Sequence, residues 1–186
     1  MPGVDPNRPF RPLRIAVLTV SDSRTLAEDR SGDTLVERLQ AAGHELVDRA
    51  LVKDDVPAIT AQFRWWIDDP GVEVVISTGG TGVTGRDVTP EALAAVQEKA
   101  IPGFGELFRM ISYAKVGTSA LQSRACAGVA RGTYIFCLPG STGAVKDGWD
   151  EILVHQLDIR HRPCNFAELL PRLREHEAAA SATPGP

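Results

Sequence analysis

The sequence has no long apolar run. No stretch approaches the roughly 18 consecutive apolar residues that a transmembrane helix requires, and the opening residues MPGVDPNRPFRP lack the apolar centre of a signal peptide. We therefore expect a cytoplasmic protein without a membrane partner.

Clusters of basic residues are also missing. The net charge is -4, and the arginines are scattered along the chain rather than gathered in one block. Because nucleic-acid binding depends on a concentrated basic surface, this distribution argues against a DNA or RNA partner.

Cysteine is scarce, with three residues in a chain of 186. Cys126, Cys137 and Cys164 lack metal-ligand spacing, and the first two lie in the apolar stretches RACAGVA and YIFCLP. We interpret the cysteines as buried structural thiols. The scattered histidines are interpreted as surface or structural residues: His44, His155, His161 and His176.

The chain does contain short, β-branched apolar runs that alternate with amphipathic segments. The expected strands cover residues 13–20, 44–52, 72–78, 122–132 and 133–140. The first expected helix follows the polar loop 21–33 and ends at Gly43, and the second runs from about residue 59 to Pro70. A third begins with Thr89 as its N-cap, and the remaining three cover residues 103–114, 141–154 and 166–174.

This alternation predicts the fold class. Strands that alternate with helices favour a three-layer α/β/α sandwich with a mostly parallel sheet. The last two strands are joined through ARGT and predict a hairpin, hence an antiparallel edge strand. We expect one domain over residues 13–175, with disordered tails at 1–12 and 176–186 because both ends are rich in proline or small residues.

The stretch STGGTGVTGRDVTPEA, residues 77–92, resembles two phosphate-binding motifs without matching either. Its glycines satisfy G-x-G-x-x-G, but RDVTP delays the following helix, whereas the dinucleotide fingerprint opens its helix within the glycines. Arg86 and Asp87 stand where a P-loop needs Lys and Ser or Thr.

The same stretch still predicts an anion site. Four of the seven residues from Gly79 to Gly85 are glycine, more than a simple surface turn needs. Bare amides and threonine hydroxyls at the carboxyl end of a strand suit a phosphate or similar oxyanion. The candidate binding residues here are Thr78, Gly79, Gly80, Thr81 and Gly82.

Two further loops follow expected strands of the same sheet. LPGSTGAV, residues 138–145, supplies Pro139, Gly140 and Ser141, and TVSDSR, residues 19–24, supplies Ser21 and Asp22. Pro-Gly alone is also consistent with an ordinary turn. Loops at one edge of a sheet favour a shared cleft over unrelated turns.

Carboxylates complete the candidate site. Asp87 follows the glycine loop. A carboxylate repels a nearby phosphate unless Mg²⁺ bridges the two groups, so Asp87 is a possible Mg²⁺ ligand. Asp54 and Asp55 follow the second strand, where they are equally consistent with capping the next helix.

Four motifs in order, STGGTGVTGRDVTPEA, PGFGELFR, LPGSTGAV and QLDIRHRPCNF, resemble the molybdenum cofactor biosynthesis family of protein B and molybdopterin adenylyltransferase. The match spans roughly residues 13–170. The resemblance implies a three-layer α/β domain that binds molybdopterin and assembles as a homotrimer or a dimer of trimers (homohexamer). Catalytic members transfer AMP from Mg·ATP to the terminal phosphate of molybdopterin, so the resemblance also implies Mg²⁺ and ATP.

The resemblance assigns roles to the loops. It implies that Gly79–Gly82 and Pro139–Ser141 hold the pterin and its phosphate. The family's two functional aspartates fall on Asp87 and Asp54, with Asp55 as an alternative because the alignment there shifts by one residue.

The ending RPCNF and Thr142, where the adenylyltransferase group usually has proline, are similar to protein B members. The leading hypothesis is adenylylation of molybdopterin, with Asp87 and Asp54 as catalytic residues. The alternatives are a molybdopterin-binding protein without catalysis and, third, a trimeric scaffold.

Overall fold

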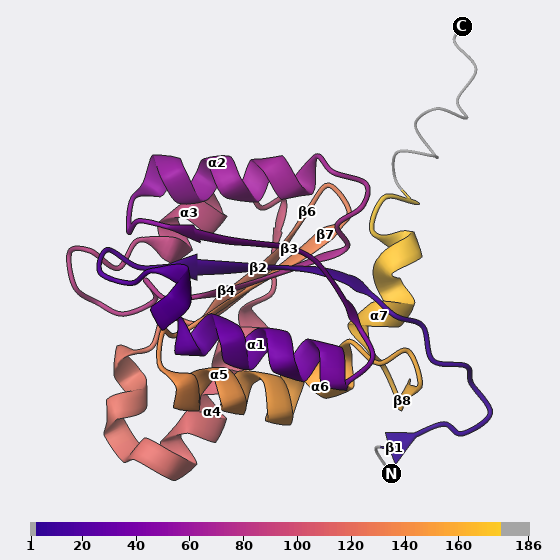
Figure 1. The fold of residues 1–186 in the computed structure, drawn as a ribbon. Coiled ribbons are helices and arrows are strands. Elements are labelled where there is room, and N and C mark those ends of the chain that lie inside the picture. Colours follow the sequence, from indigo (N-terminus) through magenta and orange to yellow (C-terminus); the bar gives the residue numbers. More distant parts are fainter. Residues whose placement is uncertain (1–2, 176–186) are drawn as a thin grey trace, which may run out of the picture.

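The computed structural model describes residues 3–175, and residues 176–186, expected as a tail, lie outside this range. Its main feature is a six-stranded sheet between two layers of helices (Figure 1). In spatial order the strands are β3 (Glu45–Val52), β2 (Arg14–Val20), β4 (Val74–Thr78), β7 (Thr133–Leu138), β6 (Cys126–Ala130) and β5 (Lys99–Ala100). The predicted α/β sandwich is confirmed.

The parallel strands form the centre of the core. β2 pairs in parallel with β3 and β4, and β4 pairs in parallel with β7. Successive residues of β2 point to opposite faces, so Ile15 and Val17 join one apolar cluster while Ala16 and Leu18 join the other. All four are completely buried, as expected for a strand covered on both faces.

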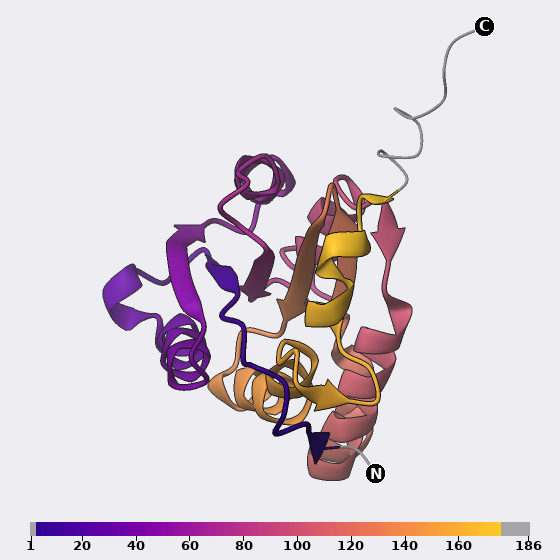
Figure 2. The same ribbon diagram turned by 90° about the vertical axis from the view of Figure 1, so that its right-hand side faces the viewer.

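The helices divide between the two faces of the sheet. α2 (Val56–Ile67) and α3 (Thr89–Ala94) cover one face, and α1 (Arg30–Ala41), α4 (Pro102–Val116) and α5 (Thr142–Gly148) cover the other (Figures 1 and 2). Trp66 of α2 anchors the first layer, and Trp149, which follows α5, anchors the second.

The antiparallel part of the sheet confirms the expected hairpin but differs in detail. β6 and β7 pair antiparallel around Arg131 and Gly132, which both have positive φ. β6 begins only at Cys126, and Gln122, expected in the strand, is the last residue of a 3₁₀ helix, η2 (Gly117–Gln122). The two-residue strand β5, which the sequence did not predict, pairs with β6 and forms the edge.

Two expected helices differ in detail from the prediction: one contains a π-helical turn and the other is shorter. The expected helix 141–154 consists of α5, a π-helical turn η3 (Trp149–Leu153) and α6 (Val154–Gln156). The expected helix 166–174 is only α7 (Phe166–Leu169), followed by the 3₁₀ turn η4 (Leu170–Arg172). Pro171 accounts for that change, since its nitrogen has no hydrogen to donate.

Residues 3–12, predicted as a disordered tail, make defined contacts. β1 (Gly3–Val4) pairs antiparallel with β8 (His161–Arg162). The ring of Phe10 lies 5.3 Å from that of the buried His44, and the Arg160 guanidinium lies 4.9 Å from the Phe10 ring. This segment, β8 and α7 lie at the right-hand end of the sheet in Figure 1.

Within residues 3–175, none of the helices has both the length and the apolar character needed to cross a bilayer.

Candidate ligand-binding cleft

A cleft of about 510 Å³ lies where β2, β4 and β7 end, at the left-hand end of the sheet in Figure 1. The predicted loops meet here, as the rule for parallel sheets requires. Its walls are Val20, Ser21, Asp22, Ser23, Arg24, Asp54, Gly79, Gly80, Thr81, Gly82, Asp87, Ser119, Gln122, Ser123, Pro139 and Gly140.

Part of the need for glycine in this loop is structural. Gly79 has a φ of 105°, and a β-carbon on it would lie 2.1 Å from the carbonyl oxygen of Val20. A β-carbon on Gly140 would lie 3.2 Å from the Cα of Gly79. Backbone therefore packs against backbone where β2, β4 and β7 end, and the glycines serve this packing as well as any ligand.

Thr81 lines the cleft and carries a buried hydroxyl without a hydrogen-bond partner among the residues described. The residue is 2% exposed. Burying a hydroxyl without a hydrogen-bond partner costs free energy, because the hydroxyl gives up the hydrogen bonds that it would make with water. A ligand oxygen in the cleft would supply the missing partner.

The helix that follows the glycine loop begins differently from the prediction. Val88 is the N-cap of α3 and Thr89 is the first helical residue. The Thr89 hydroxyl instead donates a 2.9 Å hydrogen bond to the carbonyl oxygen of Gly79. The side chain therefore holds the start of the glycine loop rather than capping its own helix.

Arg124, which the sequence analysis missed, braces the other side of this loop. Its Nε donates to the Gly82 carbonyl at 2.6 Å and its Nη2 to the Asp87 carbonyl at 2.5 Å. Nη1 pairs with the carboxylate of Glu91 in α3. One guanidinium thus fixes both ends of the segment 82–87, using the multiple donors that only arginine offers.

Asp87 faces the cleft and also shapes its own loop. Its Oδ2 accepts hydrogen bonds from the Thr84 amide at 2.8 Å and the Thr84 hydroxyl at 2.6 Å. Burial acts to raise the pKa of Asp87, but these bonds, one from the Gly82 amide and the charge of Arg124 outweigh it and lower the pKa. Asp87 is therefore a carboxylate at neutral pH.

Asp54 and Asp22 also line the cleft. Asp22 forms a two-pronged ion pair with Arg86, with both distances 2.8 Å. Within residues 3–175 no ion pair is formed by Asp54, and its pKa is raised by burial first and then by the charge of Asp22, with a smaller contribution from Asp87. The cleft thus carries three carboxylates, against the positive charges of Arg24 in its wall and of Arg86 paired with Asp22.

Three of the candidate residues do not line the cleft. The buried Thr78 hydroxyl donates to the Pro139 carbonyl at 3.0 Å. Ser141 caps α5, since its Oγ accepts from the Ala144 amide. Asp55 caps α2 through its bond from the Ala58 amide, so the structure places Asp54, not Asp55, in the cleft.

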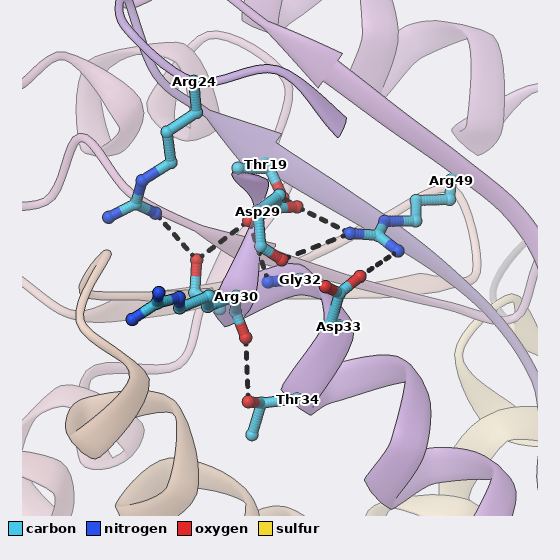
Figure 3. Close-up of polar contacts among 9 residues, drawn as sticks. Thr19, Arg24, Asp29, Arg30, Gly32, Asp33, Thr34 and Arg49 are labelled. Carbon is cyan, nitrogen blue, oxygen red and sulfur yellow. Dashed lines mark hydrogen bonds and ion pairs between the residues drawn. The ribbon is translucent and has the colours of Figure 1, made fainter. Parts of the chain in front are cut away.

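A buried carboxylate, Asp29, lies at the N-terminus of α1 and holds several neighbouring groups by hydrogen bonds (Figure 3). It accepts hydrogen bonds from the Thr19 hydroxyl at 2.5 Å and from Arg49 Nη2 at 2.9 Å, and it caps α1 through the Gly32 amide at 3.0 Å. Burial alone would raise the pKa of Asp29, but these bonds lower it. α1 consequently begins at Arg30, earlier than expected; Asp29, an aspartate at the end of a polar loop, was the available N-cap signal.

Arg24 connects this cluster to the cleft. Its Nη1 donates to Ser31 Oγ at 2.9 Å, and Ser31 in turn donates to Asp29 (Figure 3). Its Nη2 donates to the Gly140 carbonyl at 3.2 Å. Arg24 lay within the quoted TVSDSR motif but was not selected, because nothing in the sequence indicates contact with residue 140.

Two carboxylates of the cleft are suited to a magnesium ion that arrives with a substrate. Across residues 3–175, no group of three or more His, Cys, Asp or Glu side chains is placed to hold a metal by itself. Asp54 and Asp87 nevertheless share one cleft and raise its negative charge. Because Mg²⁺ commonly uses one or two carboxylates together with substrate phosphates, these residues fit a metal delivered with a nucleotide.

The family model described as "Probable molybdopterin binding domain" matches residues 16–159, most of the chain. The chain belongs to this family. It is 52% identical over 157 residues to molybdenum cofactor biosynthesis protein B of Escherichia coli K12, covering 84% of this chain and 92% of that protein. It is 46% identical over 151 residues to protein B of Staphylococcus aureus Mu50, covering 80% and 89%.

Solved structures of the family agree with this assignment. A crystal structure of molybdenum cofactor biosynthesis protein B superposes with a TM-score of 0.80 at 38% identity, covering 89% of this chain and 98% of that one. The resemblance stated from the four sequence motifs is confirmed, and the chain is a protein of molybdenum cofactor biosynthesis.

Proposed function

We propose that the chain binds molybdopterin in the cleft and transfers AMP from ATP to the terminal phosphate of the pterin. The observation that carries this proposal is the unpartnered Thr81 hydroxyl on a glycine loop that faces Asp54 and Asp87 in one cleft. Donors for a phosphate thus lie near carboxylates suited to Mg²⁺. The family membership supports molybdopterin as the ligand.

The proposed reaction needs no side-chain nucleophile. An oxygen of the terminal pterin phosphate attacks the α-phosphorus of ATP, and pyrophosphate leaves as that bond forms. When bound, Mg²⁺ would reduce the negative charge on the triphosphate. The chain itself contributes positioning: the glycine loop and Thr81 hold phosphate oxygens, and Asp54 and Asp87 orient the nucleotide and its metal.

The alternative is a protein that holds molybdopterin without transferring AMP. Thr142 and the RPCNF ending favour it, because both are features of protein B members by resemblance. The loops serve either function equally, whereas the paired Asp54 and Asp87 favour the enzyme.

The test is an assay with purified protein, molybdopterin, ATP and Mg²⁺ that detects adenylylated pterin. We expect product from the wild type and a loss of at least about tenfold, or 1.4 kcal/mol in transition-state stabilisation, in Asp87→Asn and Asp54→Asn. Asp55→Asn is the matched control, because Asp55 caps α2 outside the cleft. Pterin binding by calorimetry without product or ATP binding would establish the alternative.

We further propose that the chain acts in the cytoplasm as a homotrimer, or as a dimer of trimers. Large apolar side chains project from α4 and η2: Leu107, Met110, Tyr113, Val116 and Leu121. A surface of this kind suits contact between subunits. Light scattering should give a trimer or hexamer mass, reduced by Met110→Lys and unaffected by the equally exposed control Trp65→Lys on α2.

A further inference from the structure

Two cysteines lie directly opposite each other on the antiparallel strands β6 and β7, since Cys126 pairs in register with Cys137. Both belong to the apolar cluster on the face covered by α2 and α3. Directly opposed residues have Cα atoms about 4.5–5.5 Å apart, and disulfides span Cα distances of about 4.4–6.8 Å. The backbone therefore places the two thiols within range of a covalent bond.

The two thiols differ in access. Cys137 is completely buried, whereas Cys126 is half-buried. Cys126 also lines a cavity of about 500 Å³ between α3, α4 and β6, together with Arg109 and Arg124. A small polar oxidant entering this cavity would meet Cys126 first.

The pKa values of the two thiols also differ, again in favour of reaction at Cys126. The hydrogen bond with Cys137 is the largest influence on Cys126 and lowers its pKa; the charge of Arg124 adds to this, against the opposing effect of burial. Burial raises the pKa of Cys137 well above its usual range. Since the thiolate is the reactive form, Cys126 is the nucleophile of the pair.

We propose that Cys126 and Cys137 form a peroxide-sensitive pair in which Cys126 reacts first and Cys137 closes a disulfide. The Cys126 thiolate attacks hydrogen peroxide, the O–O bond breaks, and hydroxide leaves as Cys126 becomes a sulfenic acid. Cys137 Sγ then attacks Cys126 Sγ, the S–O bond breaks, and the departing hydroxide takes the Cys137 proton. Two thiols and one peroxide give one disulfide and two waters.

The third cysteine provides an internal control. Cys164 is exposed and lies between β8 and α7, away from the β6–β7 hairpin in the sequence. Its exposure contradicts the expectation that all three cysteines are buried. It reports general thiol accessibility, because it has no cysteine opposite it in any strand pairing of residues 3–175.

The pair is positioned to affect the cleft. Cys126 lies two residues after Arg124, which bonds the glycine loop, and Cys137 lies two residues before Pro139 of the second loop. The disulfide would therefore join the two segments that frame the cleft. The proposal itself concerns thiol chemistry and stands whether or not the chain transfers AMP.

The test treats the full chain with hydrogen peroxide, alkylates the remaining thiols and digests with trypsin without reductant. Cleavage after Arg124 and Arg131 puts the two cysteines on separate peptides. Mass spectrometry should find these peptides linked, with two hydrogens lost, and separated again by dithiothreitol; Cys164→Ser should give the same result. The proposal fails if Cys126 is alkylated as fully as before treatment, is oxidised without the link, or if Cys164 alone reacts.

A second experiment assigns the order of the steps. Dimedone present during oxidation should label Cys126 as its sulfenic acid, and Cys137→Ala should increase this label by removing the competing thiol. Cys126→Ala should leave Cys137 unmodified. Labelling of Cys137 in place of Cys126 would overturn the order, and the wild-type labelling decides it even if Cys137→Ala does not fold.

Discussion

Arg124 Nε donates a 2.6 Å hydrogen bond to the carbonyl oxygen of Gly82. A residue just before β6 thereby holds the middle of a loop that follows β4, two segments separated in the sequence by α3, β5 and α4. The position of this loop therefore depends on a distant side chain that donates hydrogen bonds to the loop's main-chain carbonyls.

Arg124→Lys should therefore weaken ligand binding at the cleft. Lysine keeps the charge opposite Glu91 but cannot also reach the Gly82 and Asp87 carbonyls. We expect the Kd or KM for the pterin to rise about tenfold, or 1.4 kcal/mol. Calorimetry checks this, with Arg38→Lys as control because Arg38 pairs with the exposed Asp150 carboxylate and is not among the residues that line the cleft.

Gly79→Ala should destabilise the fold. The residue has a positive φ, and its new β-carbon would lie 2.1 Å from the Val20 carbonyl oxygen, which is backbone and cannot rotate away. We expect a loss of about 2 kcal/mol or more in the free energy of unfolding, measured with urea. Gly85→Ala is the control, since a β-carbon there meets nothing within 4 Å; equal losses in both variants would contradict the prediction.

Asp29→Asn should also reduce stability. The substitution removes the charge opposite Arg49 and leaves an amide where the Thr19 hydroxyl and Gly32 amide need an acceptor. We expect a loss of about 2–4 kcal/mol. Asp33→Asn tests the specificity of this effect, because Asp33 bonds the same Arg49 from a half-exposed position and should cost less than about 1 kcal/mol.

The stability of the fold should decrease as the pH is lowered through the range in which histidine titrates. Burial lowers the pKa of His44 in the folded protein, despite an opposing effect of Asp158. Below the unfolded value of about 6.5, the unfolded chain binds a proton that folded His44 does not, so acid favours unfolding. The free energy of unfolding measured from pH 8 to 5 should decrease in the wild type.

His44→Asn should flatten this dependence relative to the wild type. The asparagine side chain offers an oxygen in place of Nδ1, which accepts the Leu13 amide at 3.1 Å, but does not titrate. The lowered pKa of Asp29 acts in a different window: its contribution is present above about 3.9 and is lost only as pH falls through the lower folded value. An unchanged slope in His44→Asn would exclude His44 as the source.

The features that could be predicted from the sequence follow from local patterns. Buried β-branched runs such as Arg14–Val20 indicated parallel strands, and the carboxyl ends of such strands meet at one edge. Those two facts were sufficient to bring Asp22, Gly79 and Gly140 into one cleft. Thr78 was misplaced because its side chain turns to the Pro139 carbonyl, a choice that local sequence does not determine.

The features that could not be predicted depend on distant partners. Arg124 and Arg24 reach backbone carbonyls in other segments, and a carbonyl leaves no signature in the side-chain sequence. The 3₁₀ helix η2 brings Ser119, Gln122 and Ser123 to the cleft although it precedes the antiparallel strand.

Gly140 lies so close to Gly79 that a β-carbon on it would sit 3.2 Å from the Cα of its neighbour. The floor of the cleft is therefore as narrow as two bare main chains allow. A methyl group added at position 140 would require the Gly79 main chain to shift by a few tenths of an ångström. The shape of the cleft thus depends on the absence of side chains at Gly79 and Gly140 in its two loops.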